Sequence, residues 1–392
     1  MTQTEVELLP LDTTDVDTWM GRPVGGGQLK EPVRTMDIRR WAQAMQNPNP
    51  LYYDEDYAAG SALGRIVAPQ SFTVACDVGH GATPAIQGSI PGSHMLFGGD
   101  EWWFFGPRIY PGDKIHSERS TFDYRVTNTS FAGPTMFQRG DTMYVNQRGE
   151  QVALQRSTAI RYLAENAQRL ASFADAEEPV WTAEDLDRVE REKWDYYMSF
   201  QEHARKTVKD VSEGQELPKG VLGPHTHMSL TQEWRAYPFT VWGSHEFDGG
   251  ATSTGNAGWL PEMTADQKAA AINPALADGL NYGASRGHVN DRWAKLIGMP
   301  RAYGYGASMG AWVLDYVSNW AGETGFVTHS AIQYRNPAFT GDVTYLTGTV
   351  SKVGDDPTTS DALVSVDVVM ATQEGTTMAK GPVEVRIPKE EK

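Results

Sequence analysis

The sequence contains a single cysteine, Cys76, among 392 residues. One cysteine leaves no possible intramolecular disulfide, so we expect a reducing compartment, the cytoplasm. We expect no export signal, because residues 1–19 carry five acidic and no basic side chains, the reverse of a secretory or organellar leader. The longest weakly polar run, residues 302–317, is too short and too rich in glycine to span about 30 Å of hydrocarbon.

Positive charge is also scarce. The chain has 34 Lys and Arg against 50 Asp and Glu, a formal net charge of 34 − 50 = −16. Such a chain repels a nucleic-acid backbone and an anionic lipid surface alike, so we expect neither nucleic acid nor membrane as a partner. Its length is sufficient for two domains or one large one.

Two general catalytic motifs are missing. The sequence has no phosphate-binding P-loop and no His-Glu-x-x-His zinc motif. His225 and His227 are the only closely spaced histidines, and without a third ligand they are typical of ordinary surface or core positions. We therefore expect no bound metal and no organic cofactor.

A weak internal repeat divides the chain into two halves. Each half contains a short amphipathic helix, then a Gly-Asp turn before an alternating strand-like run, then a hairpin turn that ends in glycine. The offsets are 342 − 113 = 229 and 375 − 149 = 226 residues, so the register drifts by only three. Chance similarity among common turn residues is the alternative. The matched segments are residues 33–45 and 226–237, 112–126 and 341–353, and 146–149 and 372–375.

The repeat predicts an N-terminal domain over residues 1–163 and a C-terminal domain over residues 216–392. Residues 164–215 are charged and polar, and they predict a helical connector in which Thr182 and Asp185 form a capping box. The C-terminal half also carries an insertion at about residues 238–282. Insertions of this size often shape substrate entry.

Two Asn-Pro steps follow the first predicted helix and force an extended turn. Residues 46–58 read Gln-Asn-Pro-Asn-Pro-Leu-Tyr-Tyr-Asp-Glu-Asp-Tyr-Ala. This stretch resembles the hydratase signature of MaoC-like acyl dehydratases, (R)-specific enoyl-CoA hydratases of the hot-dog fold, in which an Asp and a His form the acid/base pair. Asn47 stands in the place of that Asp and Tyr52 in the place of that His. The resemblance therefore implies that this copy orients water or substrate at most.

The second copy of the signature keeps its histidine. Residues 283–294 read Gly-Ala-Ser-Arg-Gly-His-Val-Asn-Asp-Arg-Trp-Ala, with Gly283 in place of the Asp and Ser285 in place of the Asn. The resemblance implies that His288 is the catalytic base and that Ser285 and Arg286 bind substrate. A histidine that serves only packing or hydrogen bonding is the alternative. The missing carboxylate is left open among Asp278, Asp291, Glu246, Asp248 and residues of the first copy.

Residues 298–306 resemble the family's segment before its central helix. The resemblance implies that the amide of Gly306 donates to the thioester oxygen, with Tyr305 beside the substrate. The counterpart in the first copy, residues 64–69, ends in Pro69, which removes one amide donor. Residues 98–107, Gly-Gly-Asp-Glu-Trp-Trp-Phe-Phe-Gly-Pro, resemble the fatty-acid-synthase-like dehydratase half of two-domain members. Their aromatic side chains are typical of β-sheet core, with an acyl-binding wall as the alternative.

The resemblance covers nearly the whole chain and implies an α+β, double hot-dog fold. In this fold two antiparallel sheets each wrap around a central helix, and the halves pack as a pseudo-dimer with the pocket between them. The implied function is hydration or dehydration of a 2-enoyl-CoA or 3-hydroxyacyl-CoA thioester with a bulky acyl group, by a homo-oligomer. CoA would enter only as part of the substrate. Two alternatives stay open: a catalytically weakened acyl-CoA-binding subunit of a hetero-oligomeric dehydratase, and a hot-dog thioesterase.

Overall fold

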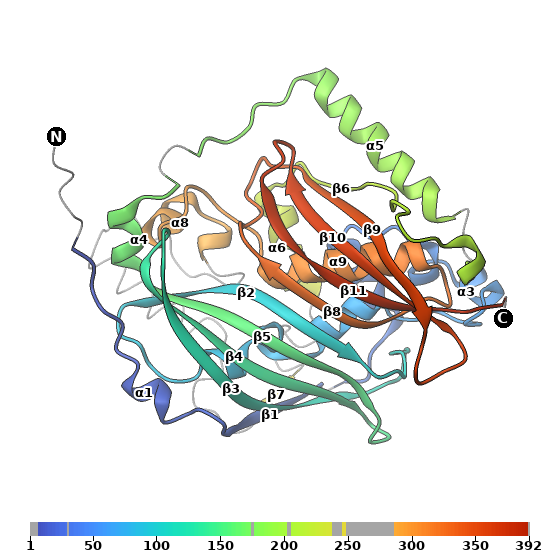
Figure 1. The fold of residues 1–392 in the computed structure, drawn as a ribbon, viewed down its shortest axis with the longest axis horizontal. Helices are drawn as coiled ribbons and strands as arrows, with labels where there is room; N and C mark the ends of the chain where they lie inside the picture. The colour runs from blue at the N-terminus through green and yellow to red at the C-terminus, as the bar shows by residue number, and fades with distance from the viewer. Residues whose placement is uncertain are drawn as a thin grey trace.

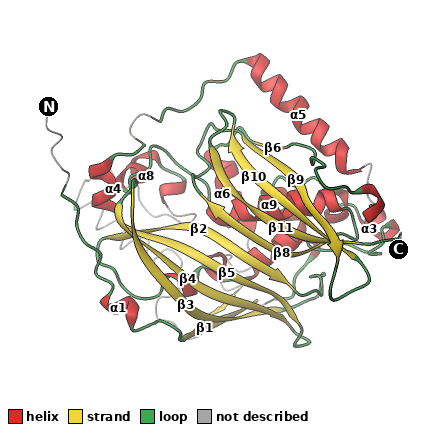
Figure 2. Cartoon of the chain, in the orientation of Figure 1, coloured by secondary structure: helices red, strands yellow, loops and turns green. Residues whose placement is uncertain are grey.

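The computed structural model describes residues 7–29, 31–173, 176–201, 205–236, 245–247 and 286–390. Eleven strands form one antiparallel sheet in the order β6-β9-β10-β11-β8-β2-β5-β4-β3-β1-β7 (Figure 1). Figure 2 shows the strands in front and most of the helices behind them. The strands are β1 (Pro23–Leu29), β2 (Ser93–Phe104), β3 (Ile115–Thr129), β4 (Gly133–Asn146), β5 (Gln151–Leu163), β6 (Gly220–Leu222), β7 (His245–Phe247), β8 (Phe326–Tyr334), β9 (Thr344–Asp355), β10 (Ala362–Thr372) and β11 (Thr377–Ile387).

The two halves meet edge to edge between β2 and β8. The pairing runs antiparallel from Gly99 opposite Gln333 to Trp103 opposite His329. Strands β1 to β5 lie on one side of this junction, and β8 to β11 with β6 lie on the other. The predicted α+β double hot-dog fold is confirmed, and its two sheets are joined into one.

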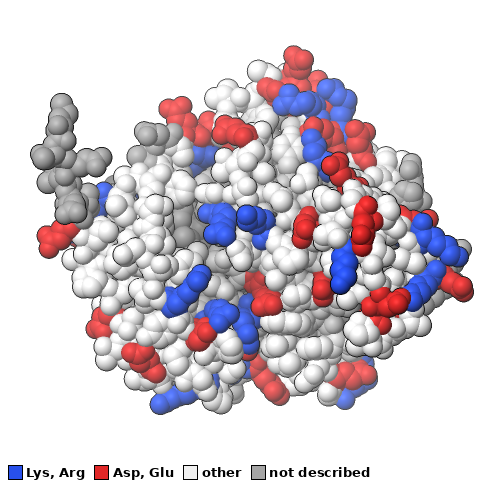
Figure 3. All heavy atoms as spheres, viewed as in Figure 1, with Lys and Arg blue, Asp and Glu red and all other residues white. Residues whose placement is uncertain are grey.

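The outer face of the sheet carries mixed charge. Acidic and basic side chains lie side by side across the face shown in Figure 3. Two bidentate pairs are examples, Arg139 with Asp123 and Arg156 with Asp141. Planar guanidinium groups suit this two-pronged pairing with carboxylates. The basic side chains of these strands are thus partly neutralised.

Eight α-helices are described, and α9 is the most deeply buried. Apart from Gly306 and Ser318, all of its residues are buried. A helix that is apolar on all sides is typical of a core helix, and α9 packs against β2, β8 and β11. The helices are α1 (Thr14–Asp17), α2 (Thr35–Ala44), α3 (Glu55–Gly60), α4 (Ala164–Leu170), α5 (Ala183–Gln201), α6 (His227–Ala236), α8 (Asp291–Leu296) and α9 (Gly306–Ala321).

The first half replaces the expected central α-helix with a chain of 3-10 turns. These are η2 (Gln70–Cys76), η3 (Val78–Gly81) and η4 (Thr83–Ile86), and η2 packs on α9. The chain of turns is interrupted at Asp77, which is extended, and again at His80 and Gly81, whose φ values of 61° and 73° are left-handed; Pro84 follows. Left-handed residues and proline both end a right-handed α-helix. The expectation of a central helix therefore holds in the second half only.

The repeated landmarks take matching positions. The two amphipathic segments form α2 and α6, which pack against each other. The turns at 146–149 and 372–375 join β4 to β5 and β10 to β11. In each, a glycine with φ near 80° donates its amide to the carbonyl three residues before it, Gly149 to Asn146 and Gly375 to Thr372.

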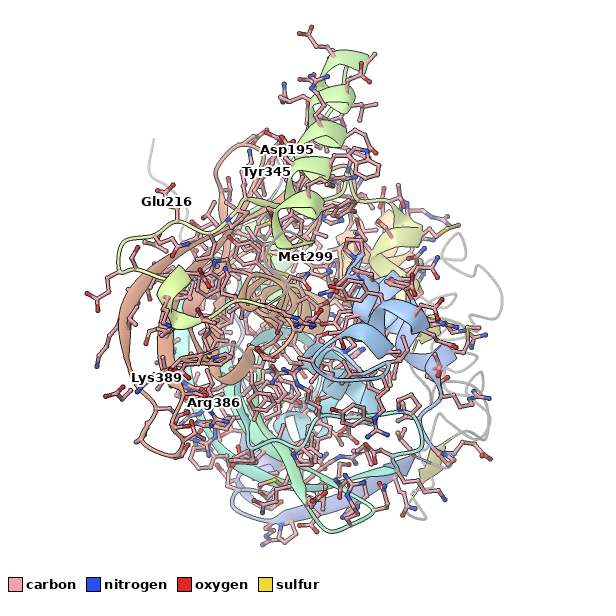
Figure 4. All side chains as sticks on the ribbon, turned by 90° about the vertical axis from the view of Figure 1, so that its right-hand side faces the viewer. Asp195, Glu216, Met299, Tyr345, Arg386 and Lys389 are labelled. Atoms are coloured by element: carbon pink, nitrogen blue, oxygen red, sulfur yellow. The ribbon has the colours of Figure 1, made fainter. Side chains whose placement is uncertain are left out.

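The connector places a long helix on the surface. In Figure 4, α5 rises above the body, with Tyr345 and Asp195 labelled beside its middle. The Tyr345 hydroxyl donates to Glu192 at 2.8 Å. The predicted capping box is confirmed, because Asp185 N donates to Thr182 Oγ1 and Thr182 N donates to Asp185 Oδ2. The domain boundaries stay a prediction, and most of the predicted insertion lies outside the described residues.

Candidate active site

The N-terminus of α9 is the centre of the site. Tyr305 precedes the helix in extended conformation, and Gly306 is its first residue. A side chain at position 306 is excluded, because its Cβ would lie 2.6 Å from Cβ of Phe97. The first amides of an α-helix lack intrahelical acceptors and carry a partial positive charge. This end of α9 is therefore suited to stabilise a developing oxyanion, and the role of Gly306 stays a prediction.

His288 lies against this helix end. It closes the 3-10 turn η7 (Arg286–His288) and is 8% exposed. Its Nδ1 lies 2.5 Å from the carbonyl oxygen of Tyr303, so Nδ1 carries the proton and donates. The ring stacks on Tyr305 with centroids 3.8 Å apart. This bond fixes a neutral tautomer that leaves Nε2 as a proton acceptor.

Burial sets the protonation state of His288. Desolvation disfavours the imidazolium and lowers its pKa from 6.5 to about 4, although the bond to the Tyr303 carbonyl acts in the opposite direction. The imidazole is therefore neutral at pH 7. A neutral histidine with a free Nε2 is a competent general base.

Two further ionisable side chains reach the same place, and the motifs did not reveal them. His80 comes from the first half, and its ring centroid lies 5.0 Å from that of Tyr305. Glu233 comes from α6 in the second half, is 1% exposed, and places Oε1 3.4 Å from Nε2 of His80. Burial lowers the pKa of His80 to about 3 and raises the pKa of Glu233 well above its ordinary value. The site is thus assembled from both halves.

The backbone at His80 is held in an unusual conformation by polar contacts from the sheet. Gln155 Nε2 donates to the carbonyl of His80 at 3.1 Å. The hydroxyls of Thr142 and Ser157 both donate to the carbonyl of Gly81. A non-glycine residue at positive φ costs free energy and persists only where its surroundings fix it. Side chains of β4 and β5 therefore hold the backbone at His80 in the conformation that directs its ring toward the second half.

A second polar network supports the wall of the site. His94 Nε2 lies 3.5 Å from the Tyr303 hydroxyl. Asp100 accepts bonds from Trp102 Nε1 at 2.8 Å and from the Tyr334 hydroxyl at 3.2 Å. Burial raises the pKa of Asp100 to about 6, and these two bonds oppose the shift. Phe97 stacks on Tyr334, which links the network to Gly306.

The structure does not bring Asn47 and Tyr52 to His288. Asn47 Oδ1 accepts a bond from Asn319 Nδ2 at 3.2 Å, near the C-terminus of α9. Asn319 follows Gly306 by 13 residues (319 − 306), which is about 20 Å along the helix axis. Tyr52 is buried near Asp315, which raises its pKa further. The first copy of the signature and the second thus lie at opposite ends of α9.

The other expected site residues are placed as follows. Ser285 lies outside the described residues, as do Asp248 and Asp278, and the side chains of Arg286 and Glu246 lie outside them too. Asp291 accepts the amide of Ala302 and faces the ring of His227 at 3.4 Å. It therefore positions the loop before α9 and is not bonded to His288.

The two closely spaced histidines have separate surroundings. His225 is buried, stacks on Trp312, and shares a 2.8 Å bond between its Nε2 and the Thr344 hydroxyl. His227 faces Asp291 at the surface. Within the described ranges, no three His, Cys, Asp or Glu side chains are placed to bind a metal ion. The expectation of no metal and no organic cofactor stays a prediction.

The aromatic run in β2 serves mainly as core. Trp102 and Phe104 are buried and stack with ring centroids 5.4 Å apart. Trp103 points to the other face of the sheet, where its ring packs against His329.

None of the described helices is long and apolar enough to cross a bilayer.

Glu233 had a signal in the sequence that the motifs did not use. It follows Leu230 by three residues on a predicted amphipathic helix, so both side chains share one face. Leu230 is buried against the loop at Gly304, and an acidic residue on such a face requires a reason. His80 had no such signal, because its contact with position 233 depends on the packing of the two halves.

Comparisons with known proteins agree with this architecture. A family model described as the FAS1-like dehydratase domain region matches residues 18–155. A Thermomonospora curvata protein named probable enoyl-CoA hydratase alpha subunit is 29% identical over 161 residues, which are 38% of this chain and 50% of that protein. The chain thus spans about half the length of this curated relative.

Solved structures match over nearly the whole chain. A MaoC-like dehydratase has a TM-score of 0.60 at 18% identity, covering 96% of this chain and 100% of its own. A putative MaoC domain protein dehydratase from Chloroflexus aurantiacus has a TM-score of 0.53 at 14% identity, covering 95% and 96%. The predicted resemblance is confirmed: the chain shares the double hot-dog fold of MaoC-like dehydratases, and residues 18–155 of its first half match the model of a FAS1-like dehydratase region.

Proposed function

We propose that this chain is a hydro-lyase that hydrates 2-enoyl-CoA thioesters and dehydrates 3-hydroxyacyl-CoA thioesters. The observation that carries the proposal is the setting of His288. Its Nδ1 is committed to the Tyr303 carbonyl, its ring rests on Tyr305, and its neutral Nε2 remains available beside the N-terminus of α9. Relatives named as dehydratases and as an enoyl-CoA hydratase subunit support the same reaction class.

The proposed chemistry needs three functions at one place. His288 Nε2 takes a proton from water as the water oxygen adds to C3 of the enoyl group. Negative charge then develops on the thioester oxygen, where the Gly306 amide and the dipole of α9 stabilise it. An acid returns a proton to C2. Tyr305, Ser285 and Arg286 are the residues proposed to contact the substrate.

The finer features of the substrate and the assembly belong to the same proposal. We expect a bulky acyl group, because the chain is rich in large aromatic side chains, with 12 Trp, 16 Tyr and 13 Phe. The predicted insertion in the second half offers extra material to enclose such a group. A homo-oligomer in the cytoplasm, with the acyl-CoA thioester as its small-molecule partner, completes this expectation.

A second candidate function has its own support. Asn47 and Gly283 stand where the family has its catalytic Asp, so neither copy of the signature has the full acid/base pair. The Thermomonospora curvata relative is named an alpha subunit. The alternative is therefore an acyl-CoA-binding subunit of a hetero-oligomeric dehydratase.

The deciding test uses a panel of trans-2-enoyl-CoAs, from short linear to aromatic and polycyclic. We expect the purified chain to consume the enoyl-thioester absorbance. We expect His288→Ala to lower turnover at least about 100-fold with little change in melting temperature, because loss of a general base costs about that much. His329→Ala, at a partly exposed histidine paired with Glu101, is the control and keeps its rate.

Two outcomes would go against the hydratase. If every substrate stays unchanged while acyl-CoA raises the melting temperature, the chain is a binding subunit. If His288→Ala stays active but unfolds at a much lower temperature, His288 has a structural role.

A further inference from the structure

Among the described residues, Glu233 is a buried carboxyl group that lacks the hydrogen-bond partners expected of a structural carboxylate. It is 1% exposed, and among the described residues neither of its oxygens accepts a hydrogen bond. Nε2 of His80 lies 3.4 Å from Oε1 of Glu233. Buried polar groups in folded proteins are nearly always hydrogen-bonded, so an orphaned buried carboxyl calls for an explanation, of which a catalytic role is one.

The position of Glu233 favours that explanation. Its helix, α6, packs against the turn that carries His288, and His80 joins Glu233 to the ring of Tyr305. The same Tyr305 ring stacks on His288. Glu233 therefore lies within the group of packed side chains that includes the proposed base.

We infer that Glu233 replaces the carboxyl group missing from the signature and acts as the general acid, with His80 as its positioning residue. The inference rests on the proposed hydratase function. In the family signature the acid lies in the loop, at the position where this chain has Gly283. Here we place the acid on helix α6 instead. It also makes the reaction depend on both halves, since His80 belongs to the first.

The protonation states suit these roles. Burial raises the pKa of Glu233 well above its ordinary value, so the group is a neutral acid over a wide pH range. Burial also holds the pKa of His80 near 3 and that of His288 near 4, so both imidazoles are neutral. Among the described residues, His80 faces Glu233 at 3.4 Å, and Glu233 contributes to the raised pKa of the Tyr334 hydroxyl. Two neighbouring groups whose pKa values are driven apart are typical of an acid/base pair.

The proton balance closes. In hydration, water gives its oxygen to C3 and one proton to Nε2 of His288, while the C2–C3 double bond shifts toward the thioester as an enolate. The Glu233 carboxyl then transfers its proton to C2 and becomes a carboxylate. The proton held on His288 passes to Glu233, directly or through a water molecule, and restores both groups. Dehydration is the same sequence in reverse.

The test is Glu233→Gln in the full chain, which keeps the shape of the side chain and removes the acid. With an enoyl-CoA that the unmodified chain hydrates, we expect kcat/KM to fall at least about 100-fold. We expect the melting temperature to stay nearly equal, because a neutral buried carboxyl is replaced by a neutral amide of the same shape. Glu233→Asp, which keeps the carboxyl, recovers part of the rate.

A matched control makes the same chemical change elsewhere. Glu323 is 9% exposed, follows α9 at its far end, and accepts the amide of Ala62. Glu323→Gln should keep its rate within about twofold. The pH profile adds a second readout: the unmodified rate declines at alkaline pH as Glu233 ionises, and the residual rate of Glu233→Gln lacks that decline.

The outcomes separate the inference from the function on which it rests. If the unmodified chain hydrates a substrate and Glu233→Gln does so at a similar rate, the inference is wrong and the hydratase stands. A low rate in both Glu233→Gln and Glu233→Asp, with melting temperatures well below that of the unmodified chain, assigns Glu233 to structure instead. If the unmodified chain hydrates none of the substrates, both the proposed hydratase function and this role of Glu233 are contradicted.

Discussion

At the scale of the residue, the site depends on side chains held in costly states. His80 keeps a left-handed backbone, Glu233 is a buried acid without bonded oxygens, and His288 is a buried neutral base. Each state lowers stability, and proteins retain such residues mainly at functional sites. The sequence could predict only His288, through its place in the signature. His80 and Glu233 are 153 residues apart (233 − 80), and only the packed halves bring them together.

The strained residue offers the first prediction at this scale. Asn tolerates positive φ, whereas Ala does not, so His80→Asn removes the imidazole and keeps the backbone. We expect His80→Asn to lose about tenfold or more in turnover with nearly unchanged stability. His80→Ala should lose the same activity and also about 1 kcal/mol in the free energy of unfolding. Enoyl-CoA assays beside denaturant titrations measure both.

The outcome that contradicts this role is specific. If His80→Asn keeps full activity, His80 neither positions Glu233 nor contacts the reacting groups. If both variants lose stability equally, the imidazole contributes packing rather than orientation.

At the scale of the element, small residues on α9 allow the sheet, with its Asp100 and Tyr334 side chains, to approach the helix closely. A Cβ at position 310 would meet the Tyr334 hydroxyl and both carboxylate oxygens of Asp100 at 3.0 Å or less. Glycine costs a helix interior about 1 kcal/mol relative to alanine, so its presence here reflects this close approach. The sequence predicted α2, α6, the hairpin turns and the cap of α5 from local patterns. It missed the 3-10 turns of the first half, which are interrupted by the extended residue Asp77 and by positive φ values at His80 and Gly81.

The packing of α9 can be tested by two alanine substitutions. Gly310→Ala should lower the free energy of unfolding by about 1–3 kcal/mol, because overpacking shifts Tyr334 and Asp100. Gly60→Ala in α3, where no atom lies within 4 Å of the added Cβ, should leave stability equal or slightly higher. Denaturant midpoints measure the two. Equal stability for Gly310→Ala would mean that the helix and sheet are not in close contact there.

At the scale of the whole molecule, the two tandem halves differ in structure and in what they contribute to the site. The repeat predicted two similar units, yet only the second has a continuous central helix, and the first contributes His80 and the strands that aim it. The junction of β2 with β8 and the separation of the two signatures along α9 depend on how the halves pack, which no local pattern encodes. We therefore place the active site at the N-terminus of α9.

The C-terminal half of α9 offers a rival carboxyl against which to test that claim. Asp315 is 5% exposed, and burial raises its pKa to about 7, so by chemistry alone it also resembles a general acid. The decisive measurement is hydration of one trans-2-enoyl-CoA by the unmodified chain, His288→Gln and Asp315→Asn, side by side. We predict a loss of at least about 100-fold in His288→Gln and a rate within about twofold of the unmodified chain in Asp315→Asn. The reverse pattern, activity lost in Asp315→Asn and kept in His288→Gln, would contradict this placement of the site.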